Sequence, residues 1–482
     1  MKPEDLLQKA MNAGLCLTPE ALAFLKELPP DKADAVMNQL SGQIFVTQEV
    51  VSELLRREEG VPQQVSPALP PAKPAVRILK DITGKSSCRG ELKDFISLFR
   101  DRFQRLASVL KSRPALNPTV PLSSLPRMEP GEEVRVIGMV ADKRETPQGH
   151  IVVELEDPAG RASVWIFKSS ELTSSAREIL PDEVLGVIGR VRESWGGSPS
   201  IFAREILWPE LHPRAWEGPE EPVYAVFISD LHIGSQMFLE STFRKFLSWL
   251  KGEGEGKLRE LAEGVRYLLI AGDVTDGIGI YPQQERELAI ADIFKQYEYA
   301  AELLSEIPDH ITVIISPGNH DAVRAAEPQP AIPKEVAGRF YELGYQMVGN
   351  PCVLDLEGIR VLMYHGRSFD DLATVLGMPR DKPTNMMRML LRKRHLSPFY
   401  GGKTALAPEN QDLMVVDEPP NIFHCGHAHI FGESEYKGML LLNSGTFQGR
   451  TSYMRKQGIN PTPGYVPVVN LQNGKVTVLH FA

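Results

Sequence analysis

The 482-residue chain lacks the features of a secreted, membrane-spanning or disulfide-stabilised protein. It has only four cysteines, which lie far apart and form no Cys-x-x-Cys pair: Cys16, Cys88, Cys352 and Cys425. This spacing argues against a zinc ribbon or a disulfide framework and favours a reducing compartment. No apolar run approaches the length of a membrane span, and the first ten residues lack the apolar core of a signal peptide. These absences predict a soluble, cytoplasmic protein that does not contact membranes.

The chain also lacks an excess of positive charge. Its formal net charge is −9 at pH 7, so the molecule as a whole does not attract nucleic acid. Binding to nucleic acid would therefore require a local basic surface or bound cations. The length of the chain predicts two to four domains.

The first 56 residues are predicted to form a small α-helical domain. Thr18 provides an N-cap with Pro19 at the first helical position, and Asp31 can cap a second helix. Apolar residues recur at helical spacing in this region, and core packing explains that pattern fully. A docking or structural module is therefore expected.

A linker and a connecting region are expected next. Residues 57–76 are rich in proline, which predicts an extended linker. Residues 77–130 form the connecting region, in which the apolar stripe predicts one helix from Glu91 to Lys111. The basic side chains outside that stripe are expected to be solvated.

Between residues 131 and 212 the apolar pattern changes to a period of two. Three such stretches, a helical stretch over residues 171–179 and two further stretches follow one another. This order is that of an OB-fold β-barrel. OB-folds bind single-stranded nucleic acid on aromatic and basic side chains, but they also act as protein-docking barrels, and both roles stay open here.

From residue 222 to residue 482 apolar strands alternate with helical stretches, which predicts an α/β domain with a mostly parallel sheet. Five of the predicted strands end in side chains that can bind a metal ion or take part in catalysis. In chain order these are Asp230, His232, Asp273, Asn319, His320, Asp321, His365, His427 and His429. Open α/β sheets place their ligands at the carboxyl ends of the strands. The pattern therefore predicts a metal site at that edge of the sheet.

These candidate ligands include carboxylate, amide and imidazole groups but no thiolate. Imidazole with carboxylate suits Mn²⁺, Fe²⁺ or Zn²⁺ better than Ca²⁺. The ligands are too many for one ion and enough for two, and Asp273, on a tight Gly-Asp turn, is the natural bridge. Two ions about 3.5–4 Å apart activate a hydroxide and stabilise an in-line displacement, which fits phosphoester hydrolysis.

The domain after residue 222 resembles the calcineurin-like metallophosphoesterases, which implies a four-layer α/β fold. The motifs that carry the resemblance are Asp230-x-His232, Gly272-Asp273-x-x-Asp276, Gly318-Asn319-His320-Asp321, His365 and Gly426-His427-x-His429. It implies that Asp230, His232, Asp273 and His429 hold one ion. The second ion would be held by Asp273, Asn319, His365 and His427. His320 would stabilise the transition state or protonate the leaving oxygen as a non-ligand, with Asp321 orienting it.

Nearly the whole chain resembles the small-subunit family of archaeal family-D DNA polymerases. The similar strings are FISDLHIGS, AGDVTDGIGIYP, PGNHDAVR, YHGRSFDD, HCGHAHIFG and RHLSPFYGGKTALAPE. This family implies a nucleoid-associated 3′→5′ proofreading exonuclease that acts on single-stranded 3′ ends of DNA and binds a large catalytic polymerase subunit. Two divalent ions are implied, with Mn²⁺ expected and Mg²⁺, Fe²⁺ or Zn²⁺ as alternatives. Eukaryotic polymerase B-subunits share the architecture but have lost ligands, whereas this chain keeps the full set.

A basic segment lies between the fourth and fifth ligand-bearing strands. Arg388, Arg392, Lys393 and Arg394 in this segment are candidates for binding DNA phosphates, and a solvated helix face is the alternative.

Two other functions stay open. One is a phosphatase or nucleotide phosphoesterase that acts on small substrates with the same ligands. The other is a non-catalytic scaffold that holds a polymerase subunit. Cleavage of single-stranded DNA and the metal content of the purified protein distinguish the three functions.

Overall fold

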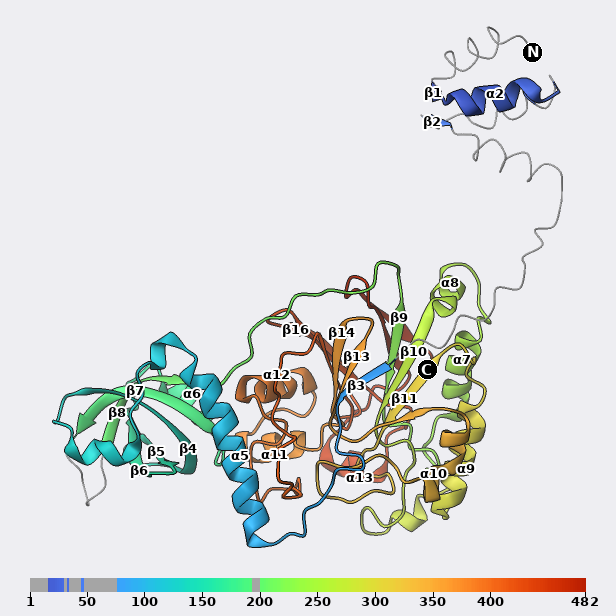
Figure 1. Ribbon diagram of the computed structural model, residues 1–482. Coiled ribbons are helices and arrows are strands. Elements are labelled where there is room, and N and C mark those ends of the chain that lie inside the picture. Colours follow the sequence, from blue (N-terminus) through green and yellow to red (C-terminus); the bar gives the residue numbers. More distant parts are fainter. Residues whose placement is uncertain (1–15, 30–32, 34–44, 47–75, 193–199) are drawn as a thin grey trace. The chain divides into compact units, whose positions relative to one another are not determined.

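The computed structural model describes residues 16–29, 33, 45–46, 76–192 and 200–482, and the chain divides into two compact units (Figure 1). In the first unit, Met1–Pro71, helix α2 (Pro19–Glu27) begins as predicted, because Thr18 Oγ1 accepts a hydrogen bond from the Ala21 N–H at 3.2 Å. Strands β1 (Cys16–Leu17) and β2 (Phe45–Val46) pair in parallel. The expected cap at Asp31 and nearly all of the expected linker lie outside the described residues.

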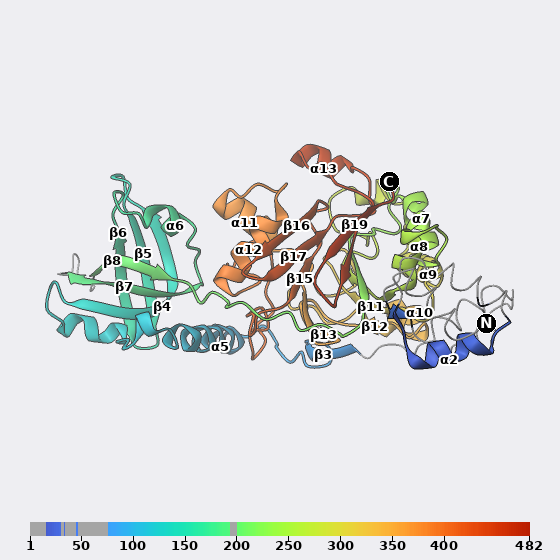
Figure 2. The same cartoon turned by 90° about the horizontal axis from the view of Figure 1, so that it is seen from above.

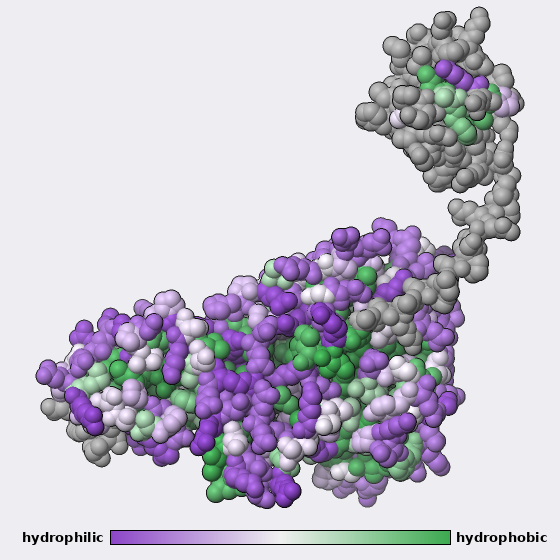
Figure 3. Space-filling view, in the orientation of Figure 1, coloured by the Kyte–Doolittle hydropathy of each residue, from purple (hydrophilic) through white to green (hydrophobic). Residues whose placement is uncertain are grey.

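The second unit, Ala72–Ala482, differs from expectation where it begins. Residues Val76–Lys80 form strand β3, which pairs antiparallel with β13 (Cys352–Leu356) at the edge of a sheet. The sequence analysis missed β3 because its residues, VRILK, do not alternate between apolar and polar; in the structure Ile78 and Leu79 are each 45% exposed. Hydrophobic side chains gather on the surface over β3 and β13 (Figure 3).

The predicted connecting helix and OB-fold are both present. Helix α5 (Leu92–Lys111) is followed by the short 3₁₀ helices η1 (Pro114–Leu116) and η2 (Leu122–Arg127). Five strands then close into a barrel in the order β4-β5-β6-β8-β7. Their bounds are β4 (Glu133–Glu145), β5 (Ile151–Asp157), β6 (Gly160–Ile166), β7 (Val184–Arg192) and β8 (Ser200–Leu207), with α6 (Thr173–Arg177) after β6. Side chains that alternate along these strands fill the barrel, as period-two patterning requires.

The rest of the second unit has two mixed six-stranded sheets where the sequence pattern predicted one mostly parallel sheet. The first has the order β12 (Gln346–Met347), β11 (Thr312–Ser316), β10 (Val265–Ala271), β9 (Tyr224–Ile228), β18 (Tyr465–Asn470) and β19 (Val476–His480). The second has the order β16 (Phe431–Tyr436), β17 (Met439–Ser444), β15 (Ile422–Cys425), β14 (Ile359–Met363), β13 and β3. Periodicity cannot reveal this division, because buried strands of either sheet are continuous apolar runs.

The two sheets pack face to face, with helices on both outer faces (Figures 1 and 2). Phe227 and Leu269 from the first sheet share one core with Leu354 and Val361 from the second. The outer face of the first sheet packs against α7 (Glu240–Leu250), α8 (Lys257–Glu263), α9 (Ile293–Leu304) and α10 (Lys334–Glu342). The outer face of the second packs against α11 (Phe369–Leu376) and α12 (Pro383–Lys393), while η3 (Gln284–Arg286) and α13 (Ser452–Gln457) lie in loops. This gives four layers.

The structure bears on two expectations, that the cysteines form no disulfide framework and that no segment spans a membrane, within the described residues. Cys88, Cys352 and Cys425 are free thiols. No described helix combines the length and the apolar character needed to cross a bilayer.

The basic end of α12 joins the two-sheet domain to the barrel. Lys393 is 1% exposed, and its Nζ lies 2.5 Å from Glu183 Oε2 beside β7. The guanidinium of Arg392 lies 4.0 Å from the centre of the Trp208 ring and pairs with Glu178. These contacts fix the barrel on the insert between β14 and β15.

The prediction that this segment binds DNA is wrong for Lys393 and Arg394. Arg394 is buried and donates hydrogen bonds to the backbone carbonyls of Val416 and Asp417. Buried cations that are already paired cannot reach a phosphate without breaking those contacts. Arg388 and Arg392 are half-buried and also contact protein groups, Ser434 in the case of Arg388.

Replacement of Lys393 tests the importance of this joint. Lys393→Met leaves Glu183 as an unpaired buried carboxylate, so the free energy of unfolding should fall by about 3–5 kcal/mol. Arg244→Met, which removes an exposed ion pair with Glu240, should change it by about 1 kcal/mol or less. Urea denaturation followed by tryptophan fluorescence measures both. The double variant Lys393→Met/Glu183→Leu should recover most of the loss, and equal losses in the single and double variants would contradict the pairing argument.

Candidate metal centre

Seven candidate ligands from both sheets meet at the carboxyl ends of five strands: Asp230 and His232 after β9, Asp273 after β10, Asn319 after β11, His365 after β14, and His427 and His429 after β15. Ligand atoms of Asp230, His232, Asp273 and His429 all lie within 4.8 Å of one another. The same holds for Asp273, His365 and His427. The structure therefore brings together every residue predicted to hold the two ions.

Asp273 belongs to both groups and lies between them. Its Oδ2 is 3.7 Å from His232 Nε2 and 3.3 Å from His365 Nε2. On one side, His232 Nε2 is 3.1 Å from His429 Nε2, and on the other His365 Nε2 is 3.1 Å from Asn319 Oδ1. One carboxylate thus faces two separate sets of donors, which is the geometry that a bridging ligand needs.

Neighbouring groups fix two of the imidazoles so that Nε2 offers its lone pair to the cluster. Nδ1 of His232 lies 2.9 Å from Asp276 Oδ1, and Nδ1 of His365 donates to the carbonyl oxygen of Ala271 at 2.8 Å. Lone pairs of imidazole and carboxylate that face one another repel unless a cation or a proton lies between them. This donor set, without thiolate, fits divalent ions such as Mn²⁺, Fe²⁺ or Zn²⁺.

The buried charges of the cluster also indicate that a cation is needed. Asp230 and Asp273 are at most 1% exposed. Burial opposes ionisation of Asp273, yet the imidazoles of His365 and His320 hold the pKa of its carboxyl well below the usual range. Burial likewise opposes protonation of His365, yet the Asp273 carboxylate raises the pKa of His365 to about 10. The cluster therefore stabilises positive charge, which a divalent ion supplies.

The ligand loops adopt a backbone conformation that side chains disfavour. Five ligand residues have a positive φ: Asp230 (53°), His232 (52°), Asp273 (51°), His427 (63°) and His429 (57°). This left-handed conformation costs about 1–2 kcal/mol per residue, and such strain gathers at functional sites. Hydrogen bonds between loops hold it in place, because the N–H groups of Asp230 and His232 donate to the carbonyls of Gly272 and Asp273, each at 3.0 Å.

Two motif glycines allow these loops to approach one another. At Gly272, where φ is +85°, a Cβ atom would lie 2.6 Å from His365 Nδ1. At Gly426 it would lie 2.4 Å from Asp230 Oδ2. A side chain at either position would push apart ligands that come from different sheets.

His320 lies beside the cluster, with its ring centre 4.6 Å from that of His232. Its Nδ1 donates to the carbonyl oxygen of Asp276 at 2.7 Å, and burial lowers the pKa of its imidazole to about 4. His232, Asp276 and His320 form a third group that could hold an ion. Asp276 thus positions two histidines, His232 through its side chain and His320 through its backbone.

The expectation that Asp321 orients His320 is wrong. The Asp321 carboxylate accepts hydrogen bonds from the Gly318 N–H and the Tyr297 hydroxyl, each at 2.9 Å. It therefore fixes the turn that carries His320, whereas the ring itself is held by Asp276. The adjacent motif positions suggested the pairing, but the turn points the two side chains to different partners.

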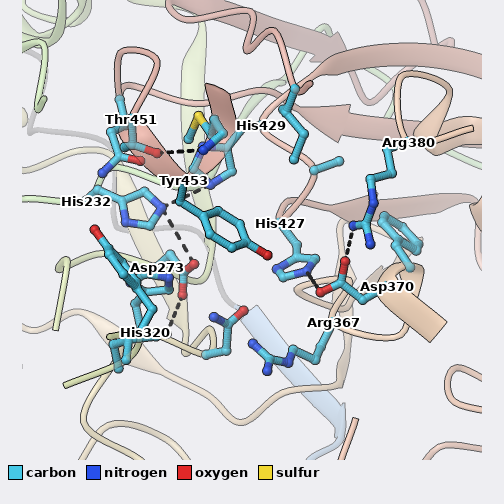
Figure 4. Close-up of a pocket in the computed structure, with 18 of the residues that line it drawn as sticks. His232, Asp273, His320, Arg367, Asp370, Arg380, His427, His429, Thr451 and Tyr453 are labelled. Atoms are coloured by element: carbon cyan, nitrogen blue, oxygen red, sulfur yellow. Dashed lines mark hydrogen bonds and ion pairs between the residues drawn. The ribbon is translucent and has the colours of Figure 1, made fainter. Parts of the chain in front are cut away.

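A cavity of about 420 Å³ lies against the cluster, and its walls include Tyr281, Arg367, Lys403 and Tyr453 (Figure 4). Arg367 and Lys403 form no ion pair with any described residue, so their charges are available to an anion. The sequence analysis assigned no role to these four residues, although Tyr281, Arg367 and Lys403 lie within the strings that carry the family resemblance.

Asp370 adds a further contact that the sequence did not reveal. Its Oδ2 lies 3.4 Å from His427 Nε2, and its other oxygen pairs with Arg380, so it lies between the two side chains (Figure 4). A carboxylate in this position orients the imidazole of a ligand.

Comparison with known proteins identifies the type of chain. Residues 225–432 match the family model of the DNA polymerase alpha/epsilon B-subunits, and residues 134–207 match that of the OB-fold nucleic acid binding domain. A barrel followed by this two-sheet domain is thus similar to the B-subunits of DNA polymerases.

Relatives that match most of the chain narrow the family assignment. The chain is 42% identical to a DNA polymerase II small subunit of Archaeoglobus fulgidus, over 98% of this chain and 97% of the relative. It is 39% identical to one of Methanothermobacter thermautotrophicus, over 99% and 100% of the two chains. It is 42% identical to one of Methanocaldococcus jannaschii, over 81% and 66%. The chain belongs to the family of archaeal DNA polymerase II (family D) small subunits, which confirms the resemblance seen in its motifs.

Removal of the shared carboxylate tests the two-ion arrangement. Wild type is expected to bind two Mn²⁺ per chain after equilibrium dialysis, measured by mass spectrometry of the metal content. Asp273→Ala is expected to lose both ions, because each group of ligands includes Asp273. Asp142→Ala, an exposed aspartate on the barrel, is the matched control and should retain both. Two ions bound to Asp273→Ala would show that the bridge lies elsewhere.

Proposed function

We propose that this chain is the 3′→5′ exonuclease subunit of a two-subunit DNA polymerase. Its two-sheet domain would act as a calcineurin-like metallophosphoesterase that hydrolyses DNA phosphodiesters with two divalent ions, Mn²⁺ being the favoured pair. The observation that carries the proposal is the Asp273 carboxylate, which faces two complete sets of donors at the carboxyl ends of strands from both sheets. The names of the relatives as small subunits support a large catalytic subunit as the partner.

Bound ions would supply an activated hydroxide and would stabilise the charge of an in-line displacement. Within the chain, Asp273 belongs to both groups of ligands, and Asp276 holds Nδ1 of His232, which leaves Nε2 as the nitrogen that faces the other ligands. Arg367 and Lys403, which form no ion pair with the described residues, line the cavity and would bind phosphate oxygens. The proposed role of His320 follows from its Nδ1 contact, since Nε2 is the nitrogen left to stabilise the reacting phosphate or pass a proton to the leaving oxygen.

The composition of the cavity favours a nucleic-acid strand over a small phosphate ester. Tyr281 and Tyr453 stack with their ring centres 6.1 Å apart on the cavity wall, and Tyr453 is 46% exposed. Aromatic rings next to a phosphate-binding group suit a substrate that carries bases. A scaffold would need neither the rings nor the strained ligand loops.

Replacement of His320 tests the proposed catalytic role. His320→Ala should lower the rate of hydrolysis of 5′-labelled single-stranded DNA by about 10²–10⁴-fold, the usual contribution of a general acid–base group. Its metal content should stay at the wild-type value, because His320 is not a proposed ligand. His212→Ala removes an exposed histidine that belongs to none of the candidate ligand groups; it is the control and should have wild-type activity.

The readout is a ladder of 3′-shortened products formed with Mn²⁺ and suppressed by EDTA. Joint loss of metal and activity in His320→Ala would make it a ligand instead of a proton donor. Cleavage of bis-p-nitrophenyl phosphate without cleavage of DNA would favour a small-substrate phosphoesterase. Two bound ions and no cleavage of either substrate would show that the chain requires its large subunit.

A further inference from the structure

The loop that carries Lys403 to the cavity is held at both ends by other parts of the chain. It runs from Pro398 to Thr404 and is called the lysine loop below. Lys403 lines the cavity and is exposed, whereas Pro398 and Thr404 are buried. The loop turns sharply at Gly401, where φ is +81°, a conformation that glycine adopts without strain. The position of Lys403 therefore depends on what holds the two ends.

Asp371, in the first turn of α11, holds the end that contains Lys403. Its two carboxylate oxygens accept hydrogen bonds from the N–H groups of Lys403, at 2.6 Å, and Thr404, at 3.1 Å. Asp371 is 5% exposed, and a Cβ atom at Gly402 would collide with its Oδ1. The loop can approach this carboxylate because residue 402 has no side chain, and the carboxylate then fixes the backbone of Lys403 itself.

The barrel and α5 hold the other end of the lysine loop. The N–H of Tyr400 donates to Asp182 Oδ2 at 2.9 Å, in the turn before β7. The carbonyl oxygen of Pro398 accepts a hydrogen bond at 3.2 Å from Arg102 of α5, which is fully buried. The ring of Tyr400 also makes edge-to-face contacts with two phenylalanine rings of α5, whose centres lie 5.5 and 5.6 Å away. The barrel therefore contacts the loop that presents Lys403.

The first turn of α11 also organises other parts of the cavity. Arg367, just before the helix, lines the cavity, and Asp370 points at His427 (Figure 4). The next residue, Asp371, holds the lysine loop. One helical turn thus relates the two unpaired cations of the cavity to a proposed metal ligand.

These restraints act on a loop that contributes little to the core. Residues 400–403 are exposed, yet hydrogen bonds fix the chain on both sides of them. A lysine side chain has a flexible four-carbon stem, so the placement of its charge depends on its backbone. A backbone that is already fixed also reduces the entropy that is lost when the side chain binds an anion.

We propose that Asp371 and Tyr400 are positioning residues, which hold the lysine loop so that Lys403 binds a phosphate oxygen of the substrate. The inference rests on the proposed function, in which Lys403 has that role, and adds the residues that act through it. Neither Asp371 nor Tyr400 is among the residues that line the cavity, so their effect passes through the loop. The barrel then contributes to substrate affinity through the contact between Asp182 and Tyr400.

Kinetics with the full chain, Mn²⁺ and a 5′-labelled oligodeoxythymidine test the proposal. Lys403→Ala should raise KM by about 10–100-fold, the effect of one lost hydrogen bond to a charged group, without lowering kcat. Asp371→Asn and Tyr400→Ala should each raise KM by about 2–10-fold, again without lowering kcat, because one end of the loop stays fixed. Tyr400→Phe keeps the ring and should have the wild-type KM.

Double variants distinguish positioning from general damage to the fold. In the Lys403→Ala background, Asp371→Asn and Tyr400→Ala should not raise KM further, because each acts through Lys403. Two matched controls should have the wild-type KM. Asp157→Asn alters a carboxylate that accepts backbone N–H groups in a barrel turn, and Phe294→Ala removes a ring that is 54% exposed on α9.

Calorimetric titration with deoxythymidine monophosphate and Mn²⁺ gives a readout that does not require hydrolysis. The single variants should weaken binding of the monophosphate in the same order as they raise KM. Wild type that binds the monophosphate but cleaves no DNA would contradict the proposed nuclease activity alone, and the order of the affinities would still decide the positioning roles. Equal Mn²⁺ content and melting temperature across the set would show intact proteins. If Asp371→Asn melts early, Tyr400→Ala, at an exposed residue, decides the outcome.

Three results would overturn the positioning roles. The first is wild-type KM and wild-type monophosphate affinity in both Asp371→Asn and Tyr400→Ala. The second is a loss in the double variants equal to the sum of the single losses, which would mean that these residues act independently of Lys403. The third is an unchanged affinity in Lys403→Ala, which would show that the loop presents no phosphate-binding group.

Discussion

The buried carboxylate of Asp273 is the constraint on which the site depends. A buried negative charge is costly unless positive charge compensates it, and here imidazoles from two different sheets approach the same oxygen. Those imidazoles come close only because five ligand residues adopt a left-handed backbone conformation. In addition, Gly272 and Gly426 have no side chain that would push the ligand loops apart. The face-to-face packing of the two sheets offsets this strain, because their shared core holds all five ligand loops at one edge.

A second set of buried charges determines how the barrel is attached. Lys393 pairs with Glu183 of the barrel, and Arg102 of α5 pairs with Asp412 of the insert at 2.7 Å. Both cations are almost completely buried, so neither pair can separate without leaving an uncompensated charge. The joint therefore holds the barrel in one orientation on the two-sheet domain. The barrel and the proposed nuclease cavity thus belong to the same compact unit.

The local pattern of the sequence predicted a large part of this architecture. Period-two stretches identified the five barrel strands, and apolar runs that end in ligands identified β9, β10, β11, β14 and β15. Strand β3 was missed because its residues do not alternate between apolar and polar, and Lys393 and Arg394 were wrongly expected to contact DNA. In both cases the deciding partner lies far away in sequence: β3 pairs with β13, and Lys393 contacts Glu183, 210 residues earlier.

By itself the sequence determined which residues are the candidate metal ligands, because each of them follows its strand directly and strand periodicity is a local property. It also determined the order of barrel and two-sheet domain and, through its motifs, the family. Only the tertiary structure decided that the ligands divide between two sheets and that Asp276, not Asp321, holds His320. It also placed Arg367 and Lys403 on the cavity wall, where they form no ion pair with the described part of the chain. Those facts depend on which surfaces pack together, and packing joins residues that no local pattern relates.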